Sequence, residues 1–204
     1  ITKKKLLFQM NDFQVFLNIN LINHKINLFI VNQKNKSIFS KNLNFPNELS
    51  SEFSILDSLD LILKDLILEI ETKMKLQLTK INLMVEQEYS KSIDISIREN
   101  FENKYIEKKN VEYLIQILRQ EITKYNLDKK IIHILVKRCV ADGEEYNNVP
   151  IGNKCKNFVV DLSFVYLPKI FMQKIEILLE NHQISINKTI CTNYAKSLLD
   201  SDFE

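Results

Sequence analysis

The sequence predicts a mixed α/β fold in two parts, and three observations support this prediction. Apolar and polar residues alternate in several short runs, which is typical of half-buried strands. Two longer segments repeat their apolar residues every three to four positions, as helices that cover a sheet do. Between the two parts, residues 100–109 are charged and have no apolar face, so we place a domain boundary there.

The first part is predicted to begin with three strands. Two alternating runs flank an Asn23-His24 turn, as in a hairpin, and their apolar residues are Val15, Leu17, Ile19, Leu21, Ile26, Leu28 and Ile30. A third strand is expected over residues 37–45. Pro46 then ends the sheet segment, and the chain turns toward a helix.

That helix is predicted to start at Ser54 as its N-cap. Its apolar stripe consists of Ile55, Leu59, Ile62, Leu63, Leu66, Ile67, Ile70 and Met74. Leu61 and Leu68 lie off the stripe, so the apolar surface is wider than one sheet face needs. We therefore expect a second packing surface on this helix.

Alternation over residues 81–85 and 93–97 predicts a β-hairpin with its turn at residues 88–91. The second part is then predicted as a helix over residues 111–125, strands over 131–140, 158–166 and 184–191, and a turn at Asp142-Gly143. A further helix opens after Pro168. Such a unit forms a small sheet with helices on one face.

Composition narrows the possible partners and compartments. The 204 residues contain 28 Lys and Arg against 26 Asp and Glu, and the formal net charge of +2 does not indicate a nucleic-acid partner. Three unpaired cysteines and the lack of a secretory signal favour the reducing cytoplasm. No apolar run is long enough to span a bilayer. The chain opens on Ile1 and stops at Glu204, so we expect a piece of a longer protein.

The order of elements after residue 131 resembles the bacterial cell-division protein FtsA. The matching features are the Asp142-Gly143 turn, the loop Asn147-Asn148-Val149-Pro150-Ile151-Gly152, and a final helix with the pattern Ala195-Lys196-Ser197. The resemblance lies in order and spacing. It implies an actin-like, ribonuclease H-like lobe, called 1A, with an inserted SHS2-type domain, called 1C.

On this resemblance, the 1A lobe covers residues 1–99, the SHS2-type interaction domain covers 100–191, and residues 192–204 return into the lobe. The family forms a homo-polymer, links the FtsZ ring to the inner face of the cytoplasmic membrane, and recruits later division proteins. The membrane helix would lie beyond Glu204. The resemblance thus implies a peripheral membrane protein of the division site.

The superfamily carries a phosphate loop of the pattern G-L-D-I-G-T-x-K, which falls on residues 18–25 of this chain. Its glycines let the phosphates approach the backbone N–H groups, and its acidic residue orients the water molecules bound to magnesium. Asn18 and Ile22 replace the glycines, and Asn20 replaces the acid, so ATP hydrolysis is not expected. At most a weak contact with ATP and Mg²⁺ is expected, through Asn20, Asn23, His24 and Lys25.

Other candidate sites are weaker. The three histidines are scattered without ligand spacing, so no metal site is predicted. Asp142, Glu144 and Glu145 are interpreted as solvated turn acids, and Cys139 as a buried structural thiol. Interface residues are expected in the loop 142–156 and on the helix that begins near Lys109.

Three alternatives stay open. A PilM-like pilus assembly protein shares the inserted module and binds a short peptide of an inner-membrane partner. A true nucleotide hydrolase of the actin and sugar-kinase kind is disfavoured by Asn18, Asn20 and Ile22. An unrelated, non-catalytic α+β protein-binding domain would match the strand order by chance.

Overall fold

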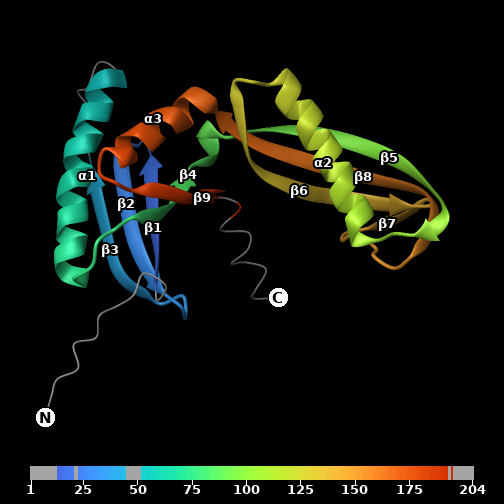
Figure 1. The fold of residues 1–204 in the computed structure, drawn as a ribbon, viewed down its shortest axis with the longest axis horizontal. Helices are drawn as coiled ribbons and strands as arrows, with labels where there is room; N and C mark the ends of the chain where they lie inside the picture. The colour runs from blue at the N-terminus through green and yellow to red at the C-terminus, as the bar shows by residue number, and fades with distance from the viewer. Residues whose placement is uncertain (1–12, 21–22, 45–51, 193, 195–204) are drawn as a thin grey trace, which may run out of the picture. The chain divides into compact units, whose positions relative to one another are not determined.

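The computed structural model describes residues 13–20, 23–44, 52–192 and 194 (Figure 1). The chain divides into two compact units. Unit 1 consists of residues 1–87 and 173–204, and unit 2 of residues 88–172. Each unit has its own sheet, and each is described separately below.

Unit 1 contains a five-stranded sheet in the order β3-β2-β1-β4-β9. The strands are β1 (Phe13–Asn20), β2 (Lys25–Asn32), β3 (Ser37–Asn44), β4 (Lys80–Val85) and β9 (Ser185–Cys191). Strand β2 runs antiparallel to both β1 and β3, whereas β4 is parallel to both β1 and β9. The carboxyl ends of β1, β4 and β9 therefore lie at one edge of the sheet.

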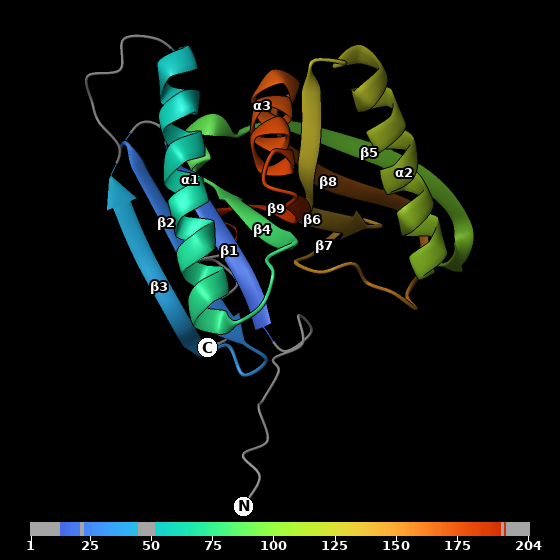
Figure 2. The same cartoon turned by 60° about the vertical axis from the view of Figure 1, so that its left-hand side comes forward.

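The core of unit 1 confirms the predicted alternation and helical stripe. Helix α1 (Glu52–Met74) runs along the sheet, as Figure 2 shows. Its buried residues are Leu59, Leu63, Leu66, Ile67 and Ile70, and the strands contribute Val15, Leu17, Ile19, Ile26, Leu28 and Ile30. The helix begins before Ser54, so the predicted N-cap is wrong. The Ile55 side chain and Leu21 lie outside what the structure describes.

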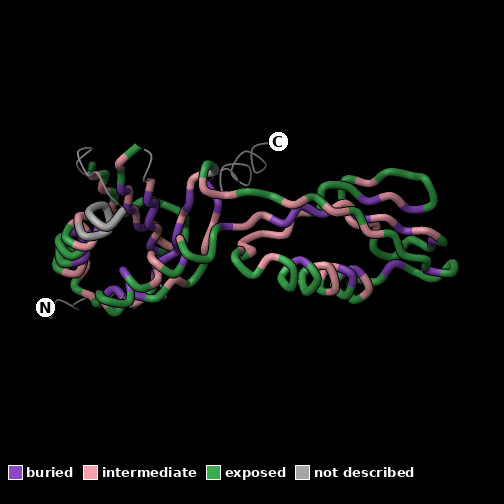
Figure 3. The backbone as a smooth tube through the Cα atoms, turned by 90° about the horizontal axis from the view of Figure 1, so that it is seen from above, coloured by how far each residue is buried: buried purple, intermediate pink, exposed green. Residues whose placement is uncertain are grey.

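Unit 2 contains a four-stranded antiparallel sheet in the order β5-β8-β6-β7. The strands are β5 (Lys91–Tyr105), β6 (Lys129–Ala141), β7 (Glu144–Tyr146) and β8 (Lys154–Pro168). Helix α2 (Lys108–Tyr125) lies along one face, with its outer side exposed (Figure 3). Its buried residues Val111, Leu114 and Ile122 join a core that includes Phe158 and Phe164. The predicted Asp142-Gly143 turn is confirmed by positive φ angles at both residues.

Two predicted pairings are wrong. Strands β4 and β5 form no hairpin, because β4 pairs with β1 and β9 while β5 pairs with β8. A short 3₁₀ turn, η2 (Gln87–Tyr89), separates the two strands. Residues 185–191, assigned to the second part, form β9 in the sheet of unit 1. Alternation reports which face of a strand is buried, and it does not reveal the neighbouring strand.

The predicted crossover at 100–109 is also corrected, because β5 continues to Tyr105. The observed units change at residues 87/88 and 172/173, whereas the predicted domains 1–99, 100–191 and 192–204 change at 99/100 and 191/192. The second change falls inside α3 (Lys169–Glu180), which opens after Pro168 as predicted. Helix α3 buries Met172, Ile175, Leu178 and Leu179.

A polar bridge joins three strands on the outer face of the unit 2 sheet. Asp161 on β8 lies directly between Ser96 on β5 and Arg138 on β6. Ser96 Oγ donates to Asp161 Oδ1 at 2.5 Å, and Arg138 Nε donates to Asp161 Oδ2 at 2.8 Å. The Ser96 bond and then the Arg138 bond hold the pKa of the Asp161 carboxyl below its ordinary value.

This bridge predicts a pH-dependent coupling between Asp161 and Arg138. A lowered folded pKa gives stabilisation that is fully present above the unfolded pKa of about 3.9. That stabilisation is lost as the pH falls through the folded pKa. Urea unfolding of Asp161→Asn, Arg138→Gln and the double variant should show a coupling free energy at pH 7 that shrinks toward pH 3. A coupling that is constant over this range would contradict the bridge.

Candidate functional site

The parallel strands of unit 1 bring three polar side chains together at their carboxyl ends. Asn18 lies near the end of β1, Glu86 directly follows β4, and Thr192 directly follows β9. Asn18 Nδ2 donates to Glu86 Oε1 at 2.7 Å, and Thr192 Oγ1 donates to Glu86 Oε2 at 2.8 Å. We call these three residues the strand-end cluster.

Two residues of the strand-end cluster are buried, Glu86 is half-buried, and both oxygens of its carboxylate accept hydrogen bonds. Asn18 is 8% exposed and Thr192 is 4% exposed. Each oxygen of Glu86 accepts a hydrogen bond from one of these neighbours, so the carboxylate links three strands. The Oδ1 atom of Asn18 is buried and has no hydrogen-bond partner among the described residues.

This donor set does not fit the magnesium ion that the resemblance implies. Magnesium is held by one or two carboxylates with several waters in a strict octahedron. Here the neutral amide of Asn20 stands where the acid would be needed, and Glu86 is bound on both oxygens by protein donors. The cluster is built to hold strands together, and its chemistry is that of a buried cross-link.

The four residues predicted to contact nucleotide lie together in the β1–β2 hairpin. Asn20 ends β1, Lys25 opens β2, and Asn23 and His24 form the turn between them. The Asn23 amide donates to Asn20 Oδ1 at 2.9 Å, so that acceptor serves the turn itself. His24 has a φ of 49°, and the Lys25 side chain is exposed. Ile22 lies outside the described residues.

Sequence reasoning missed Glu86 and Thr192. The available signal was a polar residue directly after each of two apolar strands, Lys80–Val85 and Ser185–Cys191. That signal becomes informative only when the strands are known to be parallel neighbours, because parallel strands end at the same edge. The wrong assignment of both strands hid it.

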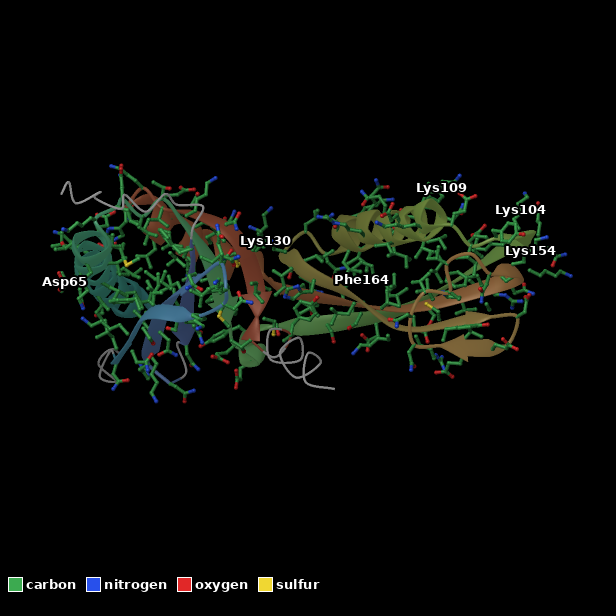
Figure 4. All side chains as sticks on the ribbon, turned by 90° about the horizontal axis from the view of Figure 1, so that it is seen from below. Asp65, Lys104, Lys109, Lys130, Lys154 and Phe164 are labelled. Carbon is green, nitrogen blue, oxygen red and sulfur yellow. The ribbon has the colours of Figure 1, made fainter. Side chains whose placement is uncertain are left out.

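Unit 2 contains a pocket of about 770 Å³ where β5 ends and α2 begins. Phe101 and Leu114 provide buried apolar surface, and Tyr105 and Tyr113 are more than half exposed. The charged residues in the lining are Glu99, Glu102, Lys104, Glu107, Lys109 and Lys154. Lys104, Lys109 and Lys154 lie at the same end of unit 2 in Figure 4. Lys109 and Lys154 belong to the two segments in which interface residues were expected.

An irregular end of β5 shapes this pocket. Asn100 pairs with Asn157 and Lys104 pairs with Cys155, so β5 has two more residues than β8 between these pairs. Glu102 and Asn103 within this bulge have φ angles of 52° and 62°. Such angles cost free energy in residues other than glycine and gather at functional sites. Phe101, at the start of the bulge, is buried against the edge of Phe158 at 5.7 Å between ring centroids.

The rim of the pocket offers aromatic surface beside charges of both signs. Lys154 Nζ lies 4.9 Å from the centroid of the Tyr105 ring. Lys104 donates to Glu102 at 2.9 Å, which lowers the pKa of Glu102 and raises the pKa of Lys104. Exposed tyrosines next to an apolar floor are typical of protein-binding surfaces. The pocket is suited to bind a peptide.

The remaining candidates behave as structural groups. Cys139 is fully buried as predicted, and burial raises the pKa of its thiol. Asp142 accepts backbone hydrogen bonds from Asn157 and Lys156 of β8, which lowers the pKa of its carboxyl. The part of the chain that the structure describes contains no group of three metal-ligating side chains. None of its helices has the length and apolarity to cross a membrane.

The strand-end cluster predicts that Glu86→Ala destabilises the protein. The substitution leaves the buried Asn18 amide without its acceptor, which costs about 1–3 kcal/mol. A catalytic acid would behave in the opposite way, because replacing it commonly leaves stability unchanged or raises it. Urea unfolding measures the difference, with the exposed Glu88→Ala as the control. Equal free energies of unfolding for the two variants would contradict the cross-link.

Comparisons with known proteins place the fold. No protein-family model matches the chain, and no curated protein matches it. A solved chain of the PilM–PilN type IV pilus biogenesis complex is 9% identical with a TM-score of 0.53, and the match covers 87% of this chain and 47% of that one. A protein of Bacteroides thetaiotaomicron with an actin-like ATPase fold and unknown function is 13% identical over 90% of this chain and 53% of that one, with a TM-score of 0.31.

This chain spans about half the length of the solved chains it matches, at 47% and 53% of their lengths. The likeness to the pilus biogenesis chain shows the fold alone. It confirms the predicted class, a mixed α/β fold.

Proposed function

We propose that this chain is a non-hydrolysing, protein-binding part of an actin-like assembly protein. One observation supports this most directly: the Glu86 carboxylate is bound by Asn18 and Thr192. The edge where the superfamily organises magnesium and phosphate is then occupied by a structural link. The neutral Asn20 at the acidic position of the loop supports the same conclusion.

Unit 2 is proposed as the interaction module, of the SHS2 type. Its elements follow the order strand, helix, strand, strand in β5, α2, β6 and β8 around the small β7 hairpin. The pocket beside α2 would hold a partner segment against Phe101 and Leu114, with Tyr113 closing over it. Tyrosine at a rim supplies large contact area at a small cost in conformational entropy.

The first candidate assembly is a pilus one of the PilM type, in which the segment comes from a PilN-type partner. The fold shared with a chain of the PilM–PilN complex supports this role. The second candidate is an FtsA-like division protein that polymerises, binds FtsZ and lies at the membrane of the division site. The loop Asn147–Gly152 favours that role, because its sequence and place follow the FtsA order.

Peptide binding tests this proposal directly. Synthetic PilN-type and FtsZ-tail peptides from the same genome would be titrated against the protein by calorimetry. Tyr113→Ala should weaken binding at least tenfold, about 1.4 kcal/mol, because a rim aromatic is lost. Tyr125→Ala is the matched control, since Tyr125 is an exposed tyrosine at the other end of α2.

The two peptides distinguish the two candidate assemblies. Tighter binding of the PilN-type peptide would indicate the pilus assembly, and tighter binding of the FtsZ-tail peptide would indicate the division assembly. Equal loss of affinity in Tyr113→Ala and Tyr125→Ala would place the site elsewhere. Labelled ATP with Mg²⁺ provides the complementary test, because turnover by the unmodified protein would defeat the non-hydrolysing assignment.

A further inference from the structure

The outer side of α1 presents an apolar pair that the fold of unit 1 leaves uncovered. Leu61 is 65% exposed and Leu68 is 63% exposed, although Leu63 and Leu66 of the same helix are buried. The two exposed leucines are seven residues apart, so they lie on one side of the helix about 10 Å apart along its axis. They form the second packing surface that the sequence predicts.

Two opposite charges lie between these leucines on the same side of the helix. Lys64 and Asp65 are both exposed, and Figure 4 shows Asp65 on the side of α1 that faces away from the sheet. Neither side chain forms a salt bridge with another described side chain. We call Leu61, Lys64, Asp65 and Leu68 the α1 outer face.

The order of these residues is self-complementary. The midpoint of positions 61 and 68 coincides with the midpoint of positions 64 and 65. A two-fold axis through that point would set Leu61 of one copy against Leu68 of the other. The same axis would set Lys64 of each copy against Asp65 of the other copy. We propose that the α1 outer face pairs antiparallel with the same face of a second copy of this chain.

A second copy fits this face better than an unrelated apolar surface. Twofold pairing buries all four leucines and places a cation beside an anion at both central positions. A parallel pairing would instead put like charges opposite each other, which costs free energy. The antiparallel arrangement also places opposite ends of the two helix dipoles together.

The size of the face sets the strength of the pairing. Stable interfaces bury about 1,200–2,000 Å², and one helix face with two leucines per copy offers less. The dimer should therefore be weak and concentration-dependent, with a Kd on the order of 10 µM to 1 mM. This pairing is independent of the unit 2 pocket, so its failure would leave the proposed function untouched.

Charge exchange tests the pairing by sedimentation velocity over a concentration series. Lys64→Glu alone and Asp65→Lys alone should each remain monomeric, because each puts like charges opposite each other twice. Mixing these two variants should restore a dimer, since every opposed pair is then attractive. The double variant with both changes should also dimerise, as the unmodified protein does.

Replacing an exposed leucine provides a second test of the pairing. Leu61→Gln should weaken self-association at least tenfold, whereas Leu127→Gln should leave it unchanged, because Leu127 is an equally exposed leucine in unit 2. Circular dichroism checks that each variant is folded. A protein that stays monomeric into the millimolar range, or a dimer that survives Lys64→Glu, would overturn the proposal.

Discussion

The structure of unit 1 depends on the position of β4 between β1 and β9. Because β4 is parallel to both neighbours, three strands end at the same edge. The chain leaves that edge after Glu86, forms unit 2, and returns to the sheet as β9. The hydrogen bonds from Asn18 and Thr192 to Glu86 then fasten the departing strand to both neighbours. The Glu86 carboxylate thus links the ends of β1, β4 and β9 at the place where the chain leaves the sheet to form unit 2.

The same bonds support the proposal that this chain binds a protein partner and does not hydrolyse nucleotide. A metal-dependent site needs acidic oxygens free to face the ion and its waters. Here both oxygens of the half-buried Glu86 accept hydrogen bonds from the protein, and Asn20 Oδ1 accepts one from its own turn. A catalytic acid is often left without protein partners, which lowers the stability of the fold. In this chain the hydrogen bonds to Glu86 stabilise the fold instead. Two consecutive residues with positive φ angles, Glu102 and Asn103, lie beside the pocket of unit 2.

Much of the local structure could be predicted from the sequence. Alternation at Leu17 and Leu28 and the stripe through Leu63 were informative because each reflects one buried face. The β1–β2 hairpin was predicted correctly, but the partners of β5 and β9 could not be predicted, because they come from distant segments. The pocket was hidden for a related reason: a bulge of charged residues around Glu102 has no apolar pattern. Glu86 became visible only through its neighbours in space.

Nuclear magnetic resonance with manganese addresses the central claim most directly. Mn²⁺ can replace Mg²⁺ at oxygen sites and broadens the signals of nuclei near it. The side-chain signals of Glu86 and Asn18 would be followed during titration with Mn²⁺ and ATP. If Glu86 is a structural link, its signals will broaden no more than those of Glu112, an exposed glutamate on α2 of unit 2. Selective broadening of Glu86 and Asn18 would mean that this edge holds a metal, and would contradict the account.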